Sequence, residues 1–102
     1  MSDVNTQDEF GYTKLHHAAM DGQYEEVRRL VERGADVNIK TKYGATAVML
    51  AACNGHGDIV QYLHQAGADI NIRDSDGRTA EMLAAEMGHE DIVKYLQAAG
   101  AK

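Results

Sequence analysis

Apolar residues recur along the chain with the spacing of short amphipathic helices. In the segment 24–33, Val27, Leu30 and Val31 stand at i, i+3 and i+4, and Val60 and Leu63 repeat this spacing in the segment 57–66. An alanine-rich segment precedes each of them, at about 14–20 and 47–53, and the same order recurs further along. The pattern predicts helix pairs, formed by 14–20 with 24–33, 47–53 with 57–66, and 80–86 with 90–99.

A step of 33 residues relates these pairs to one another. Gly11 leads to Gly44 and then to Gly77 by this step, and the threonines, alanine pairs, valines and leucines follow the same period. The chain is therefore one unit written three times. We expect a polar N-terminal segment, 1–7, followed by one domain, 8–102, with copies at 8–40, 41–73 and 74–102.

Within each copy, turn and capping residues stand where the helices should begin and end. Thr13, Thr46 and Thr79 can accept hydrogen bonds from free backbone N–H groups at a helix start. Glycines end the second helices, and Asp, Asn and Gly then suit tight turns. We expect short β-hairpin-like turns between successive copies.

The repeated unit resembles the ankyrin repeat. The family motif Thr-Pro-Leu-His is met as Thr13-Lys14-Leu15-His16, and its Gly-Ala-Asp-Val-Asn step as residues 34–38 and, with Ile70, as residues 67–71. The resemblance covers 8–102 and implies an all-α solenoid. In it, three helix pairs form a slightly curved stack with projecting hairpin tips.

The sequence departs from the family pattern at two positions of the motif. The proline is replaced by Lys14, Ala47 and Ala80, and proline at the first helical position would be pre-organised. The histidine survives only as His16. We therefore expect hydrogen bonds of that histidine in the first copy alone.

Polar substitutions distinguish the outer copies. Glu26 replaces the isoleucine of the other copies, and Glu81 replaces the apolar residue at its position. Because terminal repeats of a solenoid need a polar outer face, we interpret the chain as a complete three-repeat protein.

Composition narrows the function classes. The chain has 102 residues, a formal net charge of −6 and 44% hydrophobic residues. The acidic balance argues against a phosphate-binding surface for nucleic acid. One cysteine cannot form an internal disulfide, and neither a secretory signal nor an apolar run of about 20 residues is present. We expect a cytoplasmic monomer without membrane or nucleic-acid contacts.

Candidate catalytic and metal-binding groups have ordinary structural explanations. Cys53 could act as a nucleophile beside a histidine, but a lone small residue on an alanine-rich helix is more often a packing residue. A zinc site at His16-His17 lacks paired ligands, and the calcium-like run at 74–77 lacks a downstream glutamate. We expect no enzyme, no cofactor and no metal.

Asn38 and Asn71 allow one further reading. In animal relatives such hairpin asparagines resemble targets of asparaginyl hydroxylation, and each is preceded by an acidic and an apolar residue. The alternative, which we favour, is that each side chain bonds the hairpin backbone.

The resemblance implies binding to another protein through the hairpin tips and the exposed side of the first helices. We expect aromatic residues and arginine to dominate such an interface. The partner-binding candidates are Phe10, Tyr12, Met20, Asp21, Lys42, Tyr43, Cys53, Asn54, Arg73, Asp76, Arg78, Glu86 and Met87.

The sequence thus favours a non-catalytic protein-interaction module, one version of which is a regulator that covers a partner's functional surface. A structural self-assembly unit and a Cys53-dependent enzyme are the alternatives. The third copy carries a formal charge of −3, so a basic patch on the partner could face it.

Overall fold

The computed structural model describes residues 3–101. Met1 and Ser2 of the segment 1–7, and Lys102 of the third copy, lie outside the described residues. The helices are α1 (Lys14–Met20), α2 (Tyr24–Glu32), α3 (Ala47–Cys53), α4 (Gly57–Gln65), α5 (Ala80–Glu86) and α6 (Glu90–Ala98). The predicted helix pairs are confirmed, and each second helix ends one residue earlier than expected.

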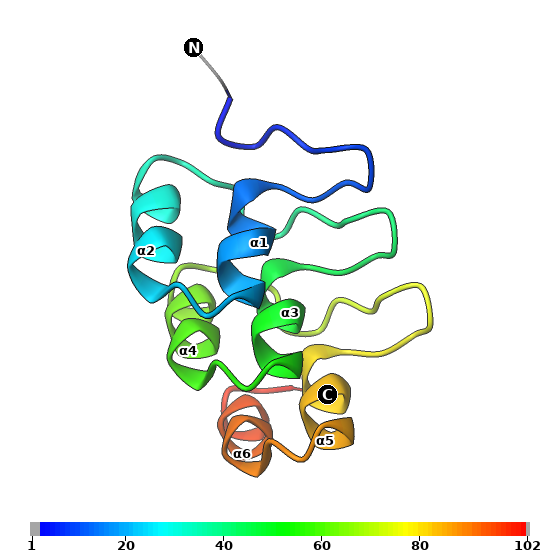
Figure 1. Ribbon diagram of the computed structural model, residues 1–102. Helices are drawn as coiled ribbons and strands as arrows, with labels where there is room; N and C mark the ends of the chain where they lie inside the picture. Colours follow the sequence, from blue (N-terminus) through cyan, green and yellow to red (C-terminus); the bar gives the residue numbers. More distant parts are fainter. Residues whose placement is uncertain (1–2, 102) are drawn as a thin grey trace.

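The helices form two layers. Helices α1, α3 and α5 lie side by side in one layer, and α2, α4 and α6 form the other (Figure 1). Each pair runs antiparallel through a turn that contains a glycine with positive φ, such as Gly22 between α1 and α2. The stack of pairs makes the molecule elongated, with extents of 40 × 26 × 20 Å.

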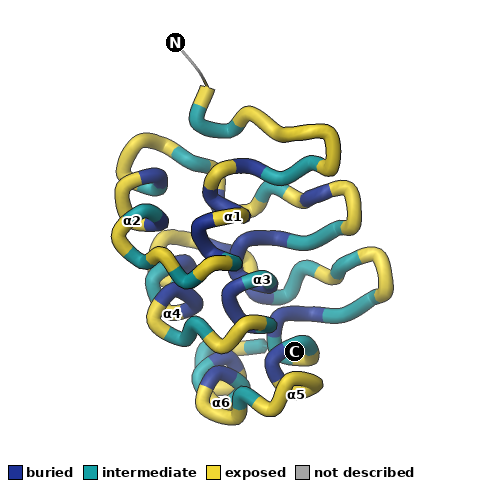
Figure 2. Tube along the Cα trace, in the orientation of Figure 1, coloured by how far each residue is buried: buried dark blue, intermediate teal, exposed yellow. Residues whose placement is uncertain are grey.

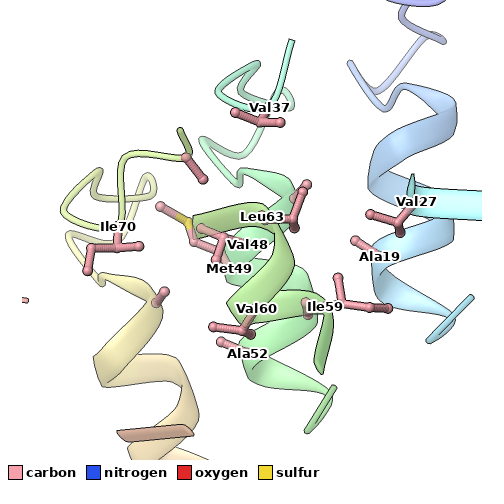
Figure 3. Close-up of a cluster of buried hydrophobic side chains, with 14 of the residues drawn as sticks. Ala19, Val27, Val37, Val48, Met49, Ala52, Ile59, Val60, Leu63 and Ile70 are labelled. Carbon is pink, nitrogen blue, oxygen red and sulfur yellow. The ribbon is translucent and has the colours of Figure 1, made fainter. Parts of the chain in front are cut away.

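The core lies between the two layers and between successive pairs. Ala19, Ala52 and Ala84 are fully buried in the first-helix layer, and their small side chains let neighbouring helices approach closely. Val27 and Ile59 reach the same core from α2 and α4 (Figures 2 and 3). The apolar periodicity of the sequence therefore faces inward in each copy.

The first helix of the first repeat begins with a reciprocal cap. The Thr13 hydroxyl accepts a hydrogen bond from the His16 N–H at 3.3 Å, and His16 Nδ1 accepts from the Thr13 N–H at 2.9 Å. His16 Nε2 lies 2.9 Å from the Ile39 carbonyl oxygen, to which it donates. Buried His16 thus ties the start of α1 to the loop that leads into the second repeat.

Capping by threonine differs between the other two copies. Thr79 accepts from the Met82 N–H at 3.3 Å, as predicted. Thr46 makes no side-chain capping hydrogen bond, so that part of the prediction is wrong. The fully buried Thr46 hydroxyl has no hydrogen-bond partner within residues 3–101.

The loops between repeats project to one side of the stack (Figure 1). In each loop one backbone bond closes the turn, from the Asp8 N–H to the Tyr12 oxygen at 2.8 Å, and equivalently from Thr41 to Ala45. Residues 3–101 contain no strand, so the β-hairpin-like detail of the expectation is not confirmed. A single closing bond holds each loop without a ladder that would define strands.

Successive loops stack directly on each other. The Lys42 N–H donates to the Phe10 oxygen at 2.9 Å. Gly11 has a φ of 82°, and a Cβ added there would lie 2.7 Å from the Lys42 nitrogen. Glycine at this position is therefore required by both conformation and close approach.

Residues near the N-terminus continue the pattern of the later repeats. The Asn5 side-chain oxygen accepts from the Asp36 N–H at 2.8 Å, and the Asn38 oxygen accepts from the Asp69 N–H at the same distance. The Gln7 amide donates to the Lys40 oxygen at 3.1 Å. These residues tie the N-terminal segment to the first repeat, and the bond made by Asn38 agrees with its expected role in the hairpin backbone.

Among residues 3–101, no helix has the length and apolar character needed to cross a membrane.

Candidate functional site

Two aromatic side chains stand exposed at the projecting loops. Phe10 is 46% exposed and Tyr43 is 55% exposed, and both occupy the same position of their repeats. We call the exposed parts of the three loops, residues 9–10, 42–43 and 75–76, the loop tips. In the third loop tip the equivalent residue is Asp76, which is also exposed.

The backbone behind each loop tip is fixed by one short polar side chain. Asp8 Oδ1 accepts from the N–H groups of Phe10 and Tyr12, each at 2.9 Å. Thr41 Oγ1 accepts from the N–H of Tyr43 at 3.2 Å, and Asp74 Oδ1 plays the same part in the third loop. The tips are therefore pre-organised, which reduces the entropy that binding would cost.

The hydrogen bonds at the first loop also act on the charge of Asp8. The Tyr12 N–H, with further contributions from the Phe10 N–H and His17, lowers the pKa of the Asp8 carboxyl below its ordinary value of 3.8. The carboxylate form holds the loop, because only its oxygens accept both N–H groups.

Tyr12 is held within the first repeat. Its ring stacks on His17, with centroids 5.1 Å apart and planes 25° apart, and meets His16 edge-on at 5.7 Å. His17 Nε2 in turn lies 3.4 Å from Asp8 Oδ2. Tyr12 is half-buried, so it offers a partner less surface than Tyr43.

Arg78 lies among three carboxylates. Its Nη1 is 3.0 Å from Glu86, its Nη2 is 3.3 Å from Asp76, and its Nε is 3.6 Å from Asp74. Glu86 foremost, with the two aspartates, raises the pKa of the Arg78 guanidinium. The cluster carries more negative than positive charge, so a partner meets an acidic patch rather than a free arginine.

The ends of the first helices supply the remaining candidates. Met87 is 57% exposed, Asp21 and Lys42 are exposed, and Met20 and Cys53 are partly exposed. They lie along the first-helix layer on the side from which the loops project. The structure therefore brings most of the candidates onto one surface.

Two candidates make contacts that shape the fold. The Asn54 amide donates to the Leu50 oxygen at 3.1 Å and to the Met20 oxygen at 3.4 Å, which joins the first two repeats. Arg73 donates to the Gly77 oxygen at 2.8 Å and so supports the third loop. For these residues a packing role is visible beside any role in binding.

Nothing around Cys53 forms a nucleophile and its base. The His89 ring lies 3.1 Å from the Cys53 backbone oxygen, to which it donates, and His56 makes the same bond to Met20. Both bonds join repeats. In the described part of the chain, no group of three metal-ligating side chains could hold an ion.

Sequence reasoning missed the residues that fix the loops. Asp8, Thr41 and Asp74 stand 33 residues apart, and all three are short side chains with a hydrogen-bond acceptor. The same period relates Asp3-Val4-Asn5 to Asp36-Val37-Asn38. Both signals lay in the repeat pattern and could have been read from it.

The fold and this surface define a class of protein, the helical-repeat solenoids that bind along one extended side. The model of ankyrin repeats in three copies matches residues 1–74, and that of ankyrin repeats in many copies matches residues 55–97. The chain belongs to the ankyrin-repeat family. The comparison with curated proteins gave no match. Ankyrin repeats are generally protein–protein interaction modules and typically non-catalytic.

Proposed function

We propose that this chain binds a partner protein through the loop tips and the exposed side of α1, α3 and α5, which together we call the loop–helix surface. The observation that carries the proposal is the exposure of large apolar side chains. Among residues 3–101, Phe10, Tyr43, Met82 and Met87 are the large hydrophobic residues classed as exposed. Three of them belong to this surface, and gathered apolar side chains mark interaction sites.

Phe10 and Tyr43 are the proposed anchors. Aromatic side chains dominate interface energies, and those of Phe10 and Tyr43 project from backbone that is already fixed. Met20, Met87 and Tyr12 supply further apolar contacts. The rim residues Asp21, Lys42 and Asp76 contribute specificity and steering rather than most of the affinity.

The charge of the surface sets the kind of partner. The acidic cluster of Asp74, Asp76 and Glu86 around Arg78 favours a partner with a basic patch over the third repeat. A small module that covers such a patch acts as a stoichiometric regulator, and this is the mode we propose.

Site-specific photocrosslinking tests the proposal. Benzoylphenylalanine replaces Phe10 or Tyr43 in one pair of variants and Gln61, an exposed residue of α4, in a control variant. The proposal predicts the same partner crosslinked from positions 10 and 43 and absent at 61. Crosslinks from 61 alone, or none from either loop tip, would refute it.

The same experiment separates the alternatives. If the species crosslinked at the loop tips is a second copy of this chain, the self-assembly hypothesis replaces binding to another protein. A Cys53-dependent enzyme would instead show rapid alkylation of the thiol together with loss of activity, independent of Phe10 and Tyr43.

A further inference from the structure

Gly57 differs from the other glycines of the chain. Nine of the ten glycines have positive φ, and Gly57, the first residue of α4, does not. A Cβ added to Gly57 would meet only the Ile92 side chain, at 3.5 and 3.9 Å, which is ordinary van der Waals contact. Neither conformation nor packing requires glycine here, although glycine in a helix costs conformational entropy.

The missing side chain leaves space between the second and third repeats. One cleft of 510 Å³ lies between the turn before α4 and the first turn of α6. A second cleft of 200 Å³ runs along α4 towards Tyr95. Both are lined by Gly57, Asp91 and Ile92, so the two form one notch, which we call the Gly57 notch.

The first repeat fills the equivalent place with an aromatic ring. Tyr24 stands 33 residues before Gly57, and its ring meets Tyr62 edge-on at 5.7 Å. Ile59, the equivalent of Ile92, is fully buried there, whereas Ile92 is 5% exposed. The repeat architecture therefore accommodates a flat group at this position, and the second repeat leaves the place open.

The notch is apolar at its floor and acidic at its rim. Ile92 and Val60 form the floor, Tyr95 lies at one end, and the exposed carboxylates of Glu90 and Asp91 stand at the opening. No lysine or arginine lines either cleft. The charge and the shape together favour a flat cation.

We propose that the Gly57 notch binds an arginine side chain of a protein partner. The guanidinium pairs with Asp91 and Glu90, and its aliphatic stem lies on Ile92 with its plane against Tyr95. Arginine fits better than lysine because its planar, weakly hydrated cation both stacks on aromatic rings and pairs with carboxylates. The notch lies on other elements than the loop–helix surface, so it is a second and separate contact.

Nuclear magnetic resonance titration with a defined probe tests this proposal. The probe is acetyl-Gly-Arg-Gly-amide, and its control is the citrulline peptide, which has the same shape without the charge. We expect saturable shifts at the amides of residues 57–60 and 90–95 with the arginine peptide, and binding at least about fivefold weaker with citrulline. Equal binding of the two peptides, or no saturable shifts, overturns the proposal.

Three variants make the test specific. Gly57→Tyr copies the first repeat and should abolish the shifts while the melting temperature stays equal or rises. Gly57→Ala adds only a methyl group and should retain binding. Asp91→Asn should weaken binding without blocking the notch, and the matched control Glu32→Gln on α2 should not. Unchanged binding in Gly57→Tyr or in Asp91→Asn overturns the assignment.

Discussion

In the second repeat, Thr46 and Met49 stand where the first repeat has Thr13 and His16. His16 bonds both Thr13 and the Ile39 carbonyl oxygen, and a methionine can make neither bond. The Thr46 hydroxyl is left buried and without a partner in the described part of the chain. A buried unsatisfied hydroxyl costs about 1–3 kcal/mol.

We therefore predict opposite effects of one substitution at two equivalent sites. Thr46→Val removes an unpaired hydroxyl and should raise the free energy of unfolding by about 1 kcal/mol. Thr13→Val removes a capping bond and should lower it by about 1 kcal/mol. Urea unfolding of both variants is the measurement. A loss of stability in Thr46→Val comparable to that in Thr13→Val would show that the hydroxyl has a partner.

His16 makes the stability of the protein depend on pH. Burial lowers the pKa of the His16 imidazole below its ordinary value of 6.5, against the opposing effect of the bond to the Ile39 carbonyl. Below pH 6.5 the unfolded chain therefore binds a proton that the folded chain does not, so stability falls as pH decreases. The contribution is fully present above about pH 6.5 and is lost towards the lower pKa of the folded state.

The pH prediction is checked by urea unfolding between pH 8 and pH 5. Wild-type protein should show a midpoint that is constant at the upper end and declines below pH 6.5. His16→Met, which copies the second and third repeats, should be less stable at pH 8 and should lose the part of the decline that His16 causes. An unchanged slope in His16→Met would contradict the assignment.

At the scale of the helices, α3 and α5 begin at Ala47 and Ala80, where the family motif has proline. Thr46 and Thr79 before them have ψ of 168° and 172°, the extended conformation that a residue before proline needs. The first N–H of a helix has no partner within it. Each helix start therefore meets the backbone requirements of proline.

Ala47→Pro and Ala80→Pro should each raise the free energy of unfolding by about 0.4–1 kcal/mol, because proline restricts the unfolded chain. Ala85→Pro, inside α5, is the control and should cost about 3 kcal/mol or more. Urea midpoints of the single and double variants provide the measurement. If both first-position variants unfold at lower urea, the buried sites do not tolerate the ring and the expectation is wrong.

The helices could be predicted closely, since glycine and threonine mark their ends in every copy. The second helices end one residue early because the residues at 33, 66 and 99 lie at their C-caps, where backbone N–H groups bond the last carbonyls. Thr46 could not be judged from its own type, because its cap depends on how residue 49 packs. The exposure of Phe10 and Tyr43 likewise depends on how successive loops stack.

At the scale of the whole molecule, the stack separates support from contact. Bonds between repeats, such as those of Asn38 and His89, run through backbone carbonyl and N–H groups, so they align the copies whatever side chains the surface carries. The loop tips and the Gly57 notch are places where the copies differ in sequence. Differences between the copies on a regular frame are what gives such a module its specificity.

The central claim is that the loop–helix surface binds a partner through exposed aromatic residues. Tyr43 tests it best, because its side chain is 55% exposed while its backbone bonds remain in Tyr43→Ala. Tyr12→Ala serves as a contrast, since loss of stacking on His17 should also reduce stability.

The decisive measurement is calorimetric titration of the partner captured at position 43, with melting temperatures recorded for the same samples. The account predicts that Tyr43→Ala weakens binding by about tenfold or more and leaves the melting temperature unchanged. An unchanged affinity, with or without a lower melting temperature, would contradict it and assign Tyr43 to packing.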